Sequence, residues 1–434
     1  MATRGGLENA MRLRVGRVLK SLCVAAALLS VQVAASRADV LSDQPAAIIV
    51  VPKIVVNSEL QVDTLIQLSN ASDEPLRLQC FYVNATPTCT NDSGNCLPGR
   101  RFVDLEPCTP TTACVQQWQE TDFQVILTQN QPVAWLASLG ARDCRQLGPT
   151  GTDTDTTNNP PCFPLDGIFR IGELGQSNAG SSVPPVPQDP FVGELKCITV
   201  DTEGQPIFRN DLYGHVTIFG PPVGDQEFPD VSGYNAIGVQ AIGICEGSDP
   251  PIVCHSDAEC PESECISQNN ADNILVLGRA GDDGVEYNGC PNILILDHFF
   301  DFGEDPVTGT PVFTDLTLVP CSEDFERQET VSVVTQFLVF NEYEQRFSTS
   351  RRVDCYRDIQ LSNIDTATAD RSIFSAQVAG TLTGQTRIRG VVGSDPAYGY
   401  TLMAVAEEFR GGGTASFNLH AQGVRPQPDY IYIP

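Results

Sequence analysis

Short apolar runs bounded by Gly, Pro, Asn and Asp recur along the chain from residue 47 onward. This pattern is typical of β-strands joined by turns, and long helical periodicity is nearly absent. We predict strands at 47–56, 64–69, 76–83, 123–128, 133–139, 194–200, 215–219, 236–244, 274–277, 293–296, 312–318, 331–340, 352–356, 374–382, 386–391, 400–406 and 414–419. Many short strands separated by turn signals favour an all-β fold built from sandwiches rather than a parallel α/β sheet.

Residues 1–38 have the pattern of a cleavable signal peptide of bacterial type. Basic residues from Arg4 to Lys20 precede an apolar stretch at 22–35, and Ser36 and Ala38 supply the small residues of a cleavage site. The apolar stretch is shorter than the roughly 20 residues of a membrane span, which favours cleavage over an anchor. We therefore expect an exported protein that starts at Asp39, with no membrane span in the mature chain.

Two stretches of the chain are similar to each other. A strand at 64–70 ends in Asn and is followed by a turn and a strand with Cys80, and a strand at 335–341 is followed in the same way by a strand with Cys355. The same order of strand, turn and cysteine-bearing strand in both stretches predicts a diverged duplication. Chance similarity between β-hairpins is the alternative. We expect a first β-sandwich domain at 39–225 with cysteine-rich loop insertions, a connecting β-rich region at 226–310 with a cysteine-rich insert at 245–265, and a second β-sandwich domain at 311–434.

The strand ending in Asn, the turn and the following strand with an aromatic residue resemble the B–C hairpin of immunoglobulin-like or fibronectin-like sandwiches. The phrases Gly193-Glu-Leu-Lys-Cys197, Asn292-Ile-Leu-Ile-Leu-Asp-His298 and Gln336-Phe-Leu-Val-Phe-Asn341 also resemble an uncharacterised family of exported bacterial proteins. These resemblances imply two tandem immunoglobulin-like domains. They bring no known activity with them.

The charge of the chain is strongly acidic. It has 26 basic and 54 acidic residues, and the leader holds six of the basic residues and one acidic residue, so the remainder carries a formal charge of −33. Only Lys53 and Lys196 remain as lysines after the leader. Such a surface repels phosphate backbones and anionic lipids, which argues against nucleic-acid or membrane-surface binding. The acidic charge is compatible with solubility, with calcium binding or with a cationic partner.

Fifteen of the 16 cysteines lie after the leader, so at least one thiol is left over unless a partner chain pairs with it. Proximity predicts local disulfides between Cys89 and Cys96, Cys108 and Cys114, and Cys144 and Cys162. The full set of disulfide candidates in loops is Cys89, Cys96, Cys108, Cys114, Cys144, Cys162, Cys245, Cys254, Cys260, Cys265, Cys290 and Cys321.

The densest cysteine group is Cys254-His-Ser-Asp-Ala-Glu-Cys260-Pro-Glu-Ser-Glu-Cys265, preceded by Cys245. It resembles a short disulfide-bonded module found as an insertion in exported bacterial proteins. Zinc is the alternative, but no Cys-x-x-Cys knuckle is present and an exported protein meets an oxidising compartment. We expect disulfides here.

Candidate catalytic or metal-binding residues are few. Asp297 and Asp301 flank His298 after an apolar strand and could act in acid–base chemistry or bind a metal ion, and Asp153 and Asp155 suggest a calcium loop without the EF-hand spacing. The alternative for Asp297 and Asp301 is a strand end with solvated polar side chains, and the alternative for Asp153 and Asp155 is an ordinary turn.

No recognised catalytic motif is present, so we expect a non-enzymatic structural, adhesion-type or surface protein. A glycan- or ligand-binding module, with calcium as an optional cofactor, is the second hypothesis. A secreted hydrolase with a carboxylate site near Asp297 and Asp301 is the third. The partner is expected to be an unknown protein or glycan.

Overall fold

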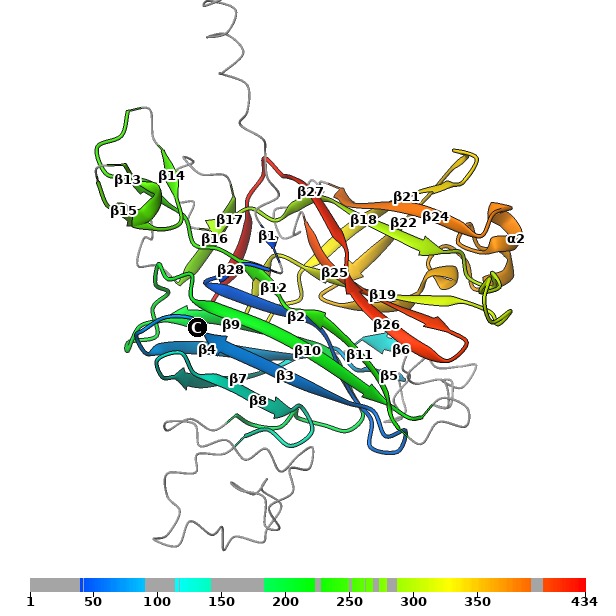
Figure 1. Cartoon of the computed structure of the whole chain (residues 1–434), viewed down its shortest axis with the longest axis horizontal. Helices are drawn as coiled ribbons and strands as arrows, with labels where there is room; N and C mark the ends of the chain where they lie inside the picture. Colours follow the sequence, from blue (N-terminus) through cyan, green and yellow to red (C-terminus); the bar gives the residue numbers. More distant parts are fainter. Residues whose placement is uncertain are drawn as a thin grey trace, which may run out of the picture. The chain divides into compact units, whose positions relative to one another are not determined.

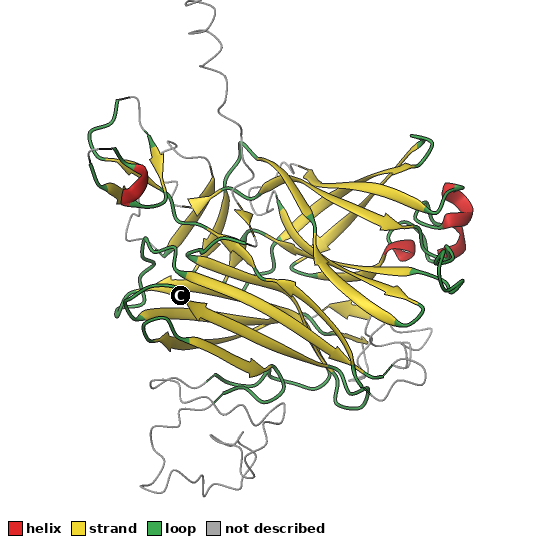
Figure 2. Ribbon diagram, viewed as in Figure 1, coloured by secondary structure: helices red, strands yellow, loops and turns green. Residues whose placement is uncertain are grey.

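Nearly all regular structure in the protein is β-strand, as the apolar pattern predicts (Figures 1 and 2). The structure is a computed structural model, and it describes residues 40–41, 43–89, 114–116, 118–141, 183–222, 228–249, 252–261, 263–267, 273–278, 287–391 and 401–434. The predicted signal peptide lies outside these residues. The all-β prediction is confirmed.

Two sheets form the first half of the molecule. One sheet has the strand order β1 (Val40–Leu41), β12 (Ile237–Val239), β2 (Ile48–Val56), β9 (Phe191–Val200), β4 (Leu76–Asn84) and β7 (Gln119–Leu127). The other has the order β11 (Asp230–Asn235), β10 (Leu212–Gly220), β3 (Asp63–Asn70) and β8 (Pro132–Leu136). Buried side chains of both sheets belong to one hydrophobic core, so the pair is a sandwich.

Two further sheets form the second half, with a separate core between them. The first has the order β22 (Arg346–Asp354), β21 (Ser332–Asn341), β24 (Thr383–Val391), β18 (Pro291–Phe299) and β27 (His420–Val424). The second has the order β23 (Arg357–Gln360), β19 (Phe313–Pro320), β25 (Leu402–Arg410) and β26 (Gly413–Asn418).

Smaller elements complete the described part of the chain. One sheet joins β17 (Tyr287–Asn288), β16 (Ile274–Gly278), β28 (Asp429–Tyr432) and β20 (Glu323–Asp324), and another joins β14 (Val253–Cys254), β13 (Gly243–Cys245) and β15 (Cys265–Ser267). A short ribbon pairs β5 (Pro87–Cys89) with β6 (Cys114–Gln116). The helical turns are η3 (Asp257–Glu259), η4 (Leu361–Asn363), η5 (Ala369–Arg371) and α2 (Ala376–Ala379).

Strands β2 and β9 are buried along their whole length. A strand at the surface of a sandwich alternates between buried and exposed positions, so full burial means that both faces are covered. The core of the first half indeed continues into residues of the second half such as Val319, Tyr356 and Val405. The six-stranded sheet is therefore a middle layer, packed on the four-stranded sheet on one side and on the second half on the other.

The strand predicted at 374–382 is wrong. Residues Ala376–Ala379 form the short helix α2, because the Ser375 side chain accepts a hydrogen bond from the Gln377 backbone N–H and caps the N-terminus. Gly380 ends the helix at φ +71°, a left-handed conformation that glycine adopts at low cost. The capping residues outweighed the apolar composition that suggested a strand.

The two similar stretches occupy different places in the fold. Strands β3 and β4 belong to opposite sheets of the first sandwich, whereas β21 and β22 are adjacent strands of one sheet and form a hairpin. Cys80 and Cys355 also differ, since Cys80 is disulfide-bonded and Cys355 is a buried thiol. The similarity of these stretches therefore reflects a shared strand–turn–strand pattern rather than equivalent positions.

The region 226–310, expected to connect two domains, contributes strands to both halves. β11 and β12 pair with strands of the first sandwich, and β18 lies inside the second. Residues 38–434 form one compact unit by their contacts.

Candidate ligand-binding groove

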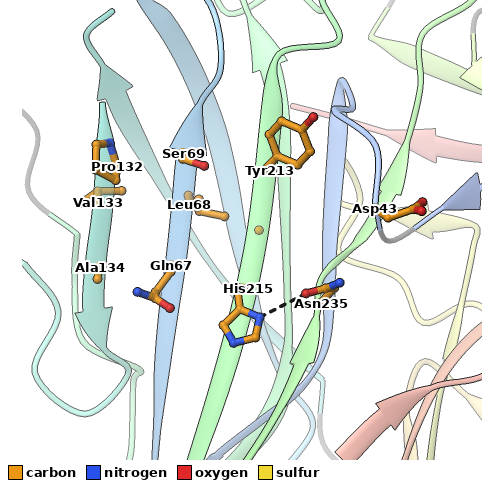
Figure 3. Close-up of a pocket in the computed structure, with 11 residues that line it drawn as sticks. Asp43, Gln67, Leu68, Ser69, Pro132, Val133, Ala134, Tyr213, His215 and Asn235 are labelled. Atoms are coloured by element: carbon orange, nitrogen blue, oxygen red, sulfur yellow. Dashed lines mark hydrogen bonds between the residues drawn. The ribbon is translucent and has the colours of Figure 1, made fainter. Parts of the chain in front are cut away.

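A shallow groove of about 680 Å³ lies on the outer face of the β11-β10-β3-β8 sheet (Figure 3). Four strands supply its floor, and Asp43 from the segment after β1 stands at one side. Its lining residues are Asp43, Gln67, Leu68, Ser69, Pro132, Val133, Ala134, Tyr213, Gly214, His215 and Asn235.

The register of the strands places the polar side chains of the groove in a row. Gln67 on β3 lies opposite Ala134 on β8 and opposite His215 on β10, and His215 lies opposite Asn235 on β11. The His215 Nδ1 and Asn235 Oδ1 atoms are 3.2 Å apart, as the dashed line in Figure 3 shows. An amide, an imidazole and a second amide thus follow one another across three strands.

A second row lies one pleat further along the same strands. Tyr213 on β10 lies opposite Ser69 on β3, which in turn lies opposite Pro132 on β8. The Tyr213 side chain is 37% exposed and presents its ring and hydroxyl beside the polar row. Aromatic rings and hydroxyls on an exposed sheet face offer both an apolar surface and hydrogen bonds.

The inner face beneath the groove has no spare room. A Cβ atom at Gly214 would lie 2.7 Å from the Ala236 Cβ and 3.0 Å from a methyl carbon of Ile49, so only glycine fits between the two sheets here. Close packing of the sheets under β10 holds the floor of the groove in place. The alternation of the strands then sends Tyr213 and His215 outward.

The chemistry of the groove suits an uncharged polar ligand. Its side-chain donors and acceptors are two amides, two hydroxyls and an imidazole, and Asp43 is the one acidic side chain that lines it. The rest of the chain is strongly acidic. A ligand with many hydroxyl groups can accept and donate hydrogen bonds here without an ionic partner.

Asp301 serves the fold rather than an open site. Its carboxylate accepts hydrogen bonds from the backbone N–H groups of Thr314 and Ser362, both at 2.9 Å, and from the Gln360 side chain at 3.1 Å. The side chain is fully buried, and burial raises its pKa despite these hydrogen bonds. Its acceptor sites are occupied by the protein itself.

Asp297 lies in a different environment from Asp301. It is exposed on β18 and accepts a hydrogen bond from Gln385 at 3.0 Å, at the side of a second hollow of about 420 Å³. The aromatic rings in that hollow are covered, because Arg410 lies 4.7 Å from the Phe299 ring centre and Arg387 lies near Phe340. The structure therefore separates the two carboxylates on which the hydrolase hypothesis depended.

His298 is buried between the sheets of the second half. Its Nε2 lies 2.8 Å from the Thr386 hydroxyl and its Nδ1 lies 2.9 Å from the Phe299 carbonyl oxygen. Burial lowers the pKa of His298 from 6.5 to about 4, so the ring is neutral at physiological pH. It packs as a core residue.

Within the described ranges, the cysteines near 245–265 form the one group that could hold a metal ion. They are disulfide-bonded instead, in the pairs Cys245–Cys260 and Cys254–Cys265. The expected disulfides are confirmed, and their pairing is interleaved. Asp153 and Asp155 lie outside the described residues, so the calcium loop stays a prediction.

The other cysteines add a pair that the sequence did not suggest. Cys80 and Cys197 lie opposite each other on the adjacent strands β4 and β9 and form a disulfide, and Cys290 pairs with Cys321. The backbones of Cys89 and Cys114 are directly opposed in the β5–β6 ribbon. The remaining candidates Cys96, Cys108, Cys144 and Cys162 lie outside the described residues.

Both lysines of the predicted mature chain are buried, which sequence reasoning missed. Lys53 on β2 lies 3.0 Å from Asp358 and 2.7 Å from Glu407, and its side chain is 1% exposed. Asp358 and Glu407 belong to β23 and β25 of the second half. The available signal was a single lysine inside the apolar run Val-Val-Pro-Lys-Ile-Val-Val.

Lys196 on β9 forms a second buried cluster. Its Nζ lies 2.5 Å from Glu323 and 3.1 Å from Glu194, and all three side chains are fully buried. The Trp118 indole N–H donates to the other oxygen of Glu323 at 3.3 Å. Burial raises the pKa of Glu194 to about 8, although the positive charge of Lys196 acts in the opposite direction.

No protein-family model and no curated protein matches this chain. None of the described helices has the length and apolar character needed to cross a membrane. Interpretation of the groove therefore depends on its own geometry and chemistry.

Proposed function

We propose that this chain is an exported, non-enzymatic surface protein of adhesion type that binds a neutral, hydroxyl-rich ligand such as a glycan on the outer face of its four-stranded sheet. The observation that carries the proposal is the ordered row of Gln67, His215 and Asn235 beside the exposed Tyr213 ring. Planar amides and an aromatic ring on a rigid sheet face give directional hydrogen bonds and an apolar platform for a sugar ring.

Several features support export and a structural role. The disulfide bonds are typical of proteins that fold in an oxidising compartment, and residues 1–38 have the pattern of a signal peptide. Asp301 is saturated with hydrogen bonds from its own chain, and His298 is a neutral core residue. These two residues are better explained by the fold than by catalysis.

The test is a glycan array probed with the purified exported chain, followed by calorimetric titration of the best ligand. We expect Tyr213→Ala and Gln67→Ala each to weaken binding about tenfold, because a central aromatic or bidentate amide carries much of the energy of a small interface. Tyr343→Ala is the matched control, since Tyr343 is a 73% exposed tyrosine outside the groove. Unchanged binding in Tyr213→Ala, or no ligand on the array, would contradict the proposal.

A further inference from the structure

Lys53, Asp358 and Glu407 form a closed triad between the two halves of the molecule. The lysine Nζ contacts Asp358 Oδ1 at 3.0 Å and Glu407 Oε2 at 2.7 Å, and each side chain is at most 2% exposed. An ordinary surface ion pair needs neither burial nor a second carboxylate on the same nitrogen. The triad holds an amine, a carboxyl group and a proton acceptor in contact and away from solvent.

We infer that this triad forms an intramolecular isopeptide bond, in which Lys53 Nζ becomes covalently linked to the side-chain carbonyl carbon of Asp358. The reaction joins one ammonium and one carboxylate into an amide and releases one water molecule. It is a condensation without change of oxidation state, so no oxidant, reductant or cofactor takes part. The link would join β2 of the first half to β23 of the second.

Glu407 is the catalytic residue of this reaction because it contacts the reacting nitrogen. Its Oε2 accepts a proton from the Lys53 ammonium and passes it to the Asp358 carboxylate, and the freed amine then attacks the carbon of the protonated carboxyl group. Glu407 next accepts a second proton from the nitrogen of the tetrahedral intermediate and passes it to the departing hydroxyl oxygen, the carbon–oxygen bond breaks, and water leaves. The third proton of the ammonium stays on the amide nitrogen, and Glu407 returns to a carboxylate.

Neighbouring hydroxyl groups fix both carboxyl groups in place. The Thr317 hydroxyl donates to Asp358 Oδ1 at 2.9 Å, which polarises that carbonyl oxygen as charge develops on it. The Ser416 hydroxyl donates to Glu407 Oε1 at 3.1 Å and leaves Oε2 directed at the lysine. Groups held in contact in this way react as if at very high concentration.

Burial and the neighbouring charges act in opposite directions on the protonation of the two reactants. Burial is the largest cause that raises the pKa of Asp358, which favours the protonated acid. Burial alone lowers the pKa of Lys53, although the charges of Asp358 and Glu407 outweigh it and the net pKa is raised. Transfer of a proton from the ammonium to a carboxylate removes a pair of buried charges together with their desolvation cost. Exclusion of water also opposes hydrolysis of the product.

The Lys196 cluster does not meet the same conditions. Its second carboxyl group, Glu194, has a pKa raised to about 8 and therefore does not take the ammonium proton at neutral pH. Glu194 also lies only two residues from Lys196 on the same strand. Lys196 thus serves as an internal comparison for the same measurement.

The test is the intact mass of the exported full chain after complete reduction and alkylation of its cysteines. We expect a mass lower than the sequence requires by one water molecule. Trypsin should then fail to cleave after Lys53, and the peptide 358–371 should remain joined to the peptide that contains Lys53 and ends at Arg77. The proposal would be overturned if the exported chain had the mass calculated from its sequence, without the loss of water. It would also be overturned if the loss of water mapped to Lys196.

Two variants separate the catalytic step from folding. Glu407→Gln keeps the size of the side chain and its contact with Ser416 but cannot carry the proton, so we expect the full sequence mass in a folded protein. Glu323→Gln is the matched control in the other cluster, and it should keep the loss of one water molecule. A Glu407→Gln protein that still lacks one water at Lys53 would contradict the role of Glu407. The result for the native chain stands by itself if a variant does not fold.

Discussion

The two buried lysines join the halves of the molecule in different ways. Lys53 faces two carboxylates that come from β23 and β25, and hydroxyl groups of Thr317 and Ser416 hold those carboxylates. Lys196 faces one carboxylate from its own strand and one from β20, and an indole N–H holds the latter. Each cluster has one carboxylate more than it has lysines.

The difference lies in how the extra carboxylate is accommodated. In the Lys196 cluster burial raises the pKa of Glu194 to about 8, so this carboxyl group stays protonated near neutral pH. Nearby Glu120 is similar, since burial and then Asp122 raise its pKa to about 8. The Lys53 cluster instead surrounds its carboxylates with hydroxyl donors. Burial also raises the pKa of Asp358, but in the cross-linked protein that we propose Asp358 no longer titrates, so we expect the pH response from the Lys196 cluster.

Removal of a lysine should have the largest effect on stability. Lys196→Met leaves Glu194 and Glu323 buried without their cation, and we expect the free energy of unfolding to fall by about 3–5 kcal/mol. Lys53→Met should cost at least as much, since it also removes the proposed cross-link. Denaturant unfolding measures both losses, and we expect an unchanged m-value for Lys196→Met and a larger m-value for Lys53→Met, whose unfolded chain lacks the cross-link. A loss well under 1 kcal/mol for Lys196→Met would show that the cluster is not a closed ion network.

The pH dependence of stability separates the two clusters next. The Glu194 pKa rises from 4.5 in the unfolded chain to about 8 in the folded protein, so the folded state keeps a proton that the unfolded state loses. Its contribution is complete below pH 4.5 and decreases as the pH rises to about 8. Glu194→Gln should remove this decrease because an amide stays neutral at every pH.

The measurement is the free energy of unfolding in denaturant at several pH values between 4.5 and 8. Glu59→Gln is the matched control, since Glu59 is an exposed glutamate outside both clusters. A Glu194→Gln protein that loses stability with rising pH as steeply as the native chain would show that the extra carboxylate is held in another way.

His298 should give a smaller dependence of the opposite sign. Burial lowers its pKa from 6.5 to about 4, so between these values the unfolded chain binds a proton that the folded protein does not. Stability is therefore complete above pH 6.5 and is lost as the pH falls to about 4. His298→Gln should flatten this acid limb in the same titration and leave the slope due to Glu194 unchanged. An acid limb of equal depth in the variant would assign it to other groups.

An exposed ion pair should show the smallest effect. Arg352 Nε lies 2.5 Å from Asp354 Oδ1, but the arginine side chain is 56% exposed. Exposed pairs contribute about 0–1 kcal/mol because water screens the charges, so Arg352→Met should change the free energy of unfolding by no more than that. A loss as large as that of Lys196→Met would mean that burial does not explain the difference between the lysines and this arginine.

Strand positions were readable from the sequence where a strand has its own apolar pattern. The predicted strand at 47–56 corresponds to β2, and the one at 331–340 corresponds to β21. Prediction was wrong at 374–382, where capping by Ser375 and Gly380 produced a helix. The short strand β27 was missed, since it lacks an apolar run.

The candidate groove could not be found in the same way. Its polar row comes from residues 67, 215 and 235, which become neighbours only through the pairing of β3, β10 and β11. Asp297 and Asp301 are the opposite case, because nearness in the sequence does not bring them into one site. They are close in the sequence, yet one is exposed and the other is saturated with internal hydrogen bonds.

The sequence by itself determined that this protein is all-β and cross-linked by disulfides, because strand alternation and cysteine content are local properties of the chain. Tertiary structure alone decided which carboxylates face Lys53 and Lys196, how Cys245, Cys254, Cys260 and Cys265 pair, and where the groove forms. These features depend on contacts between strands far apart in the sequence. Such contacts follow from sheet pairing and layer packing, and no local pattern records them.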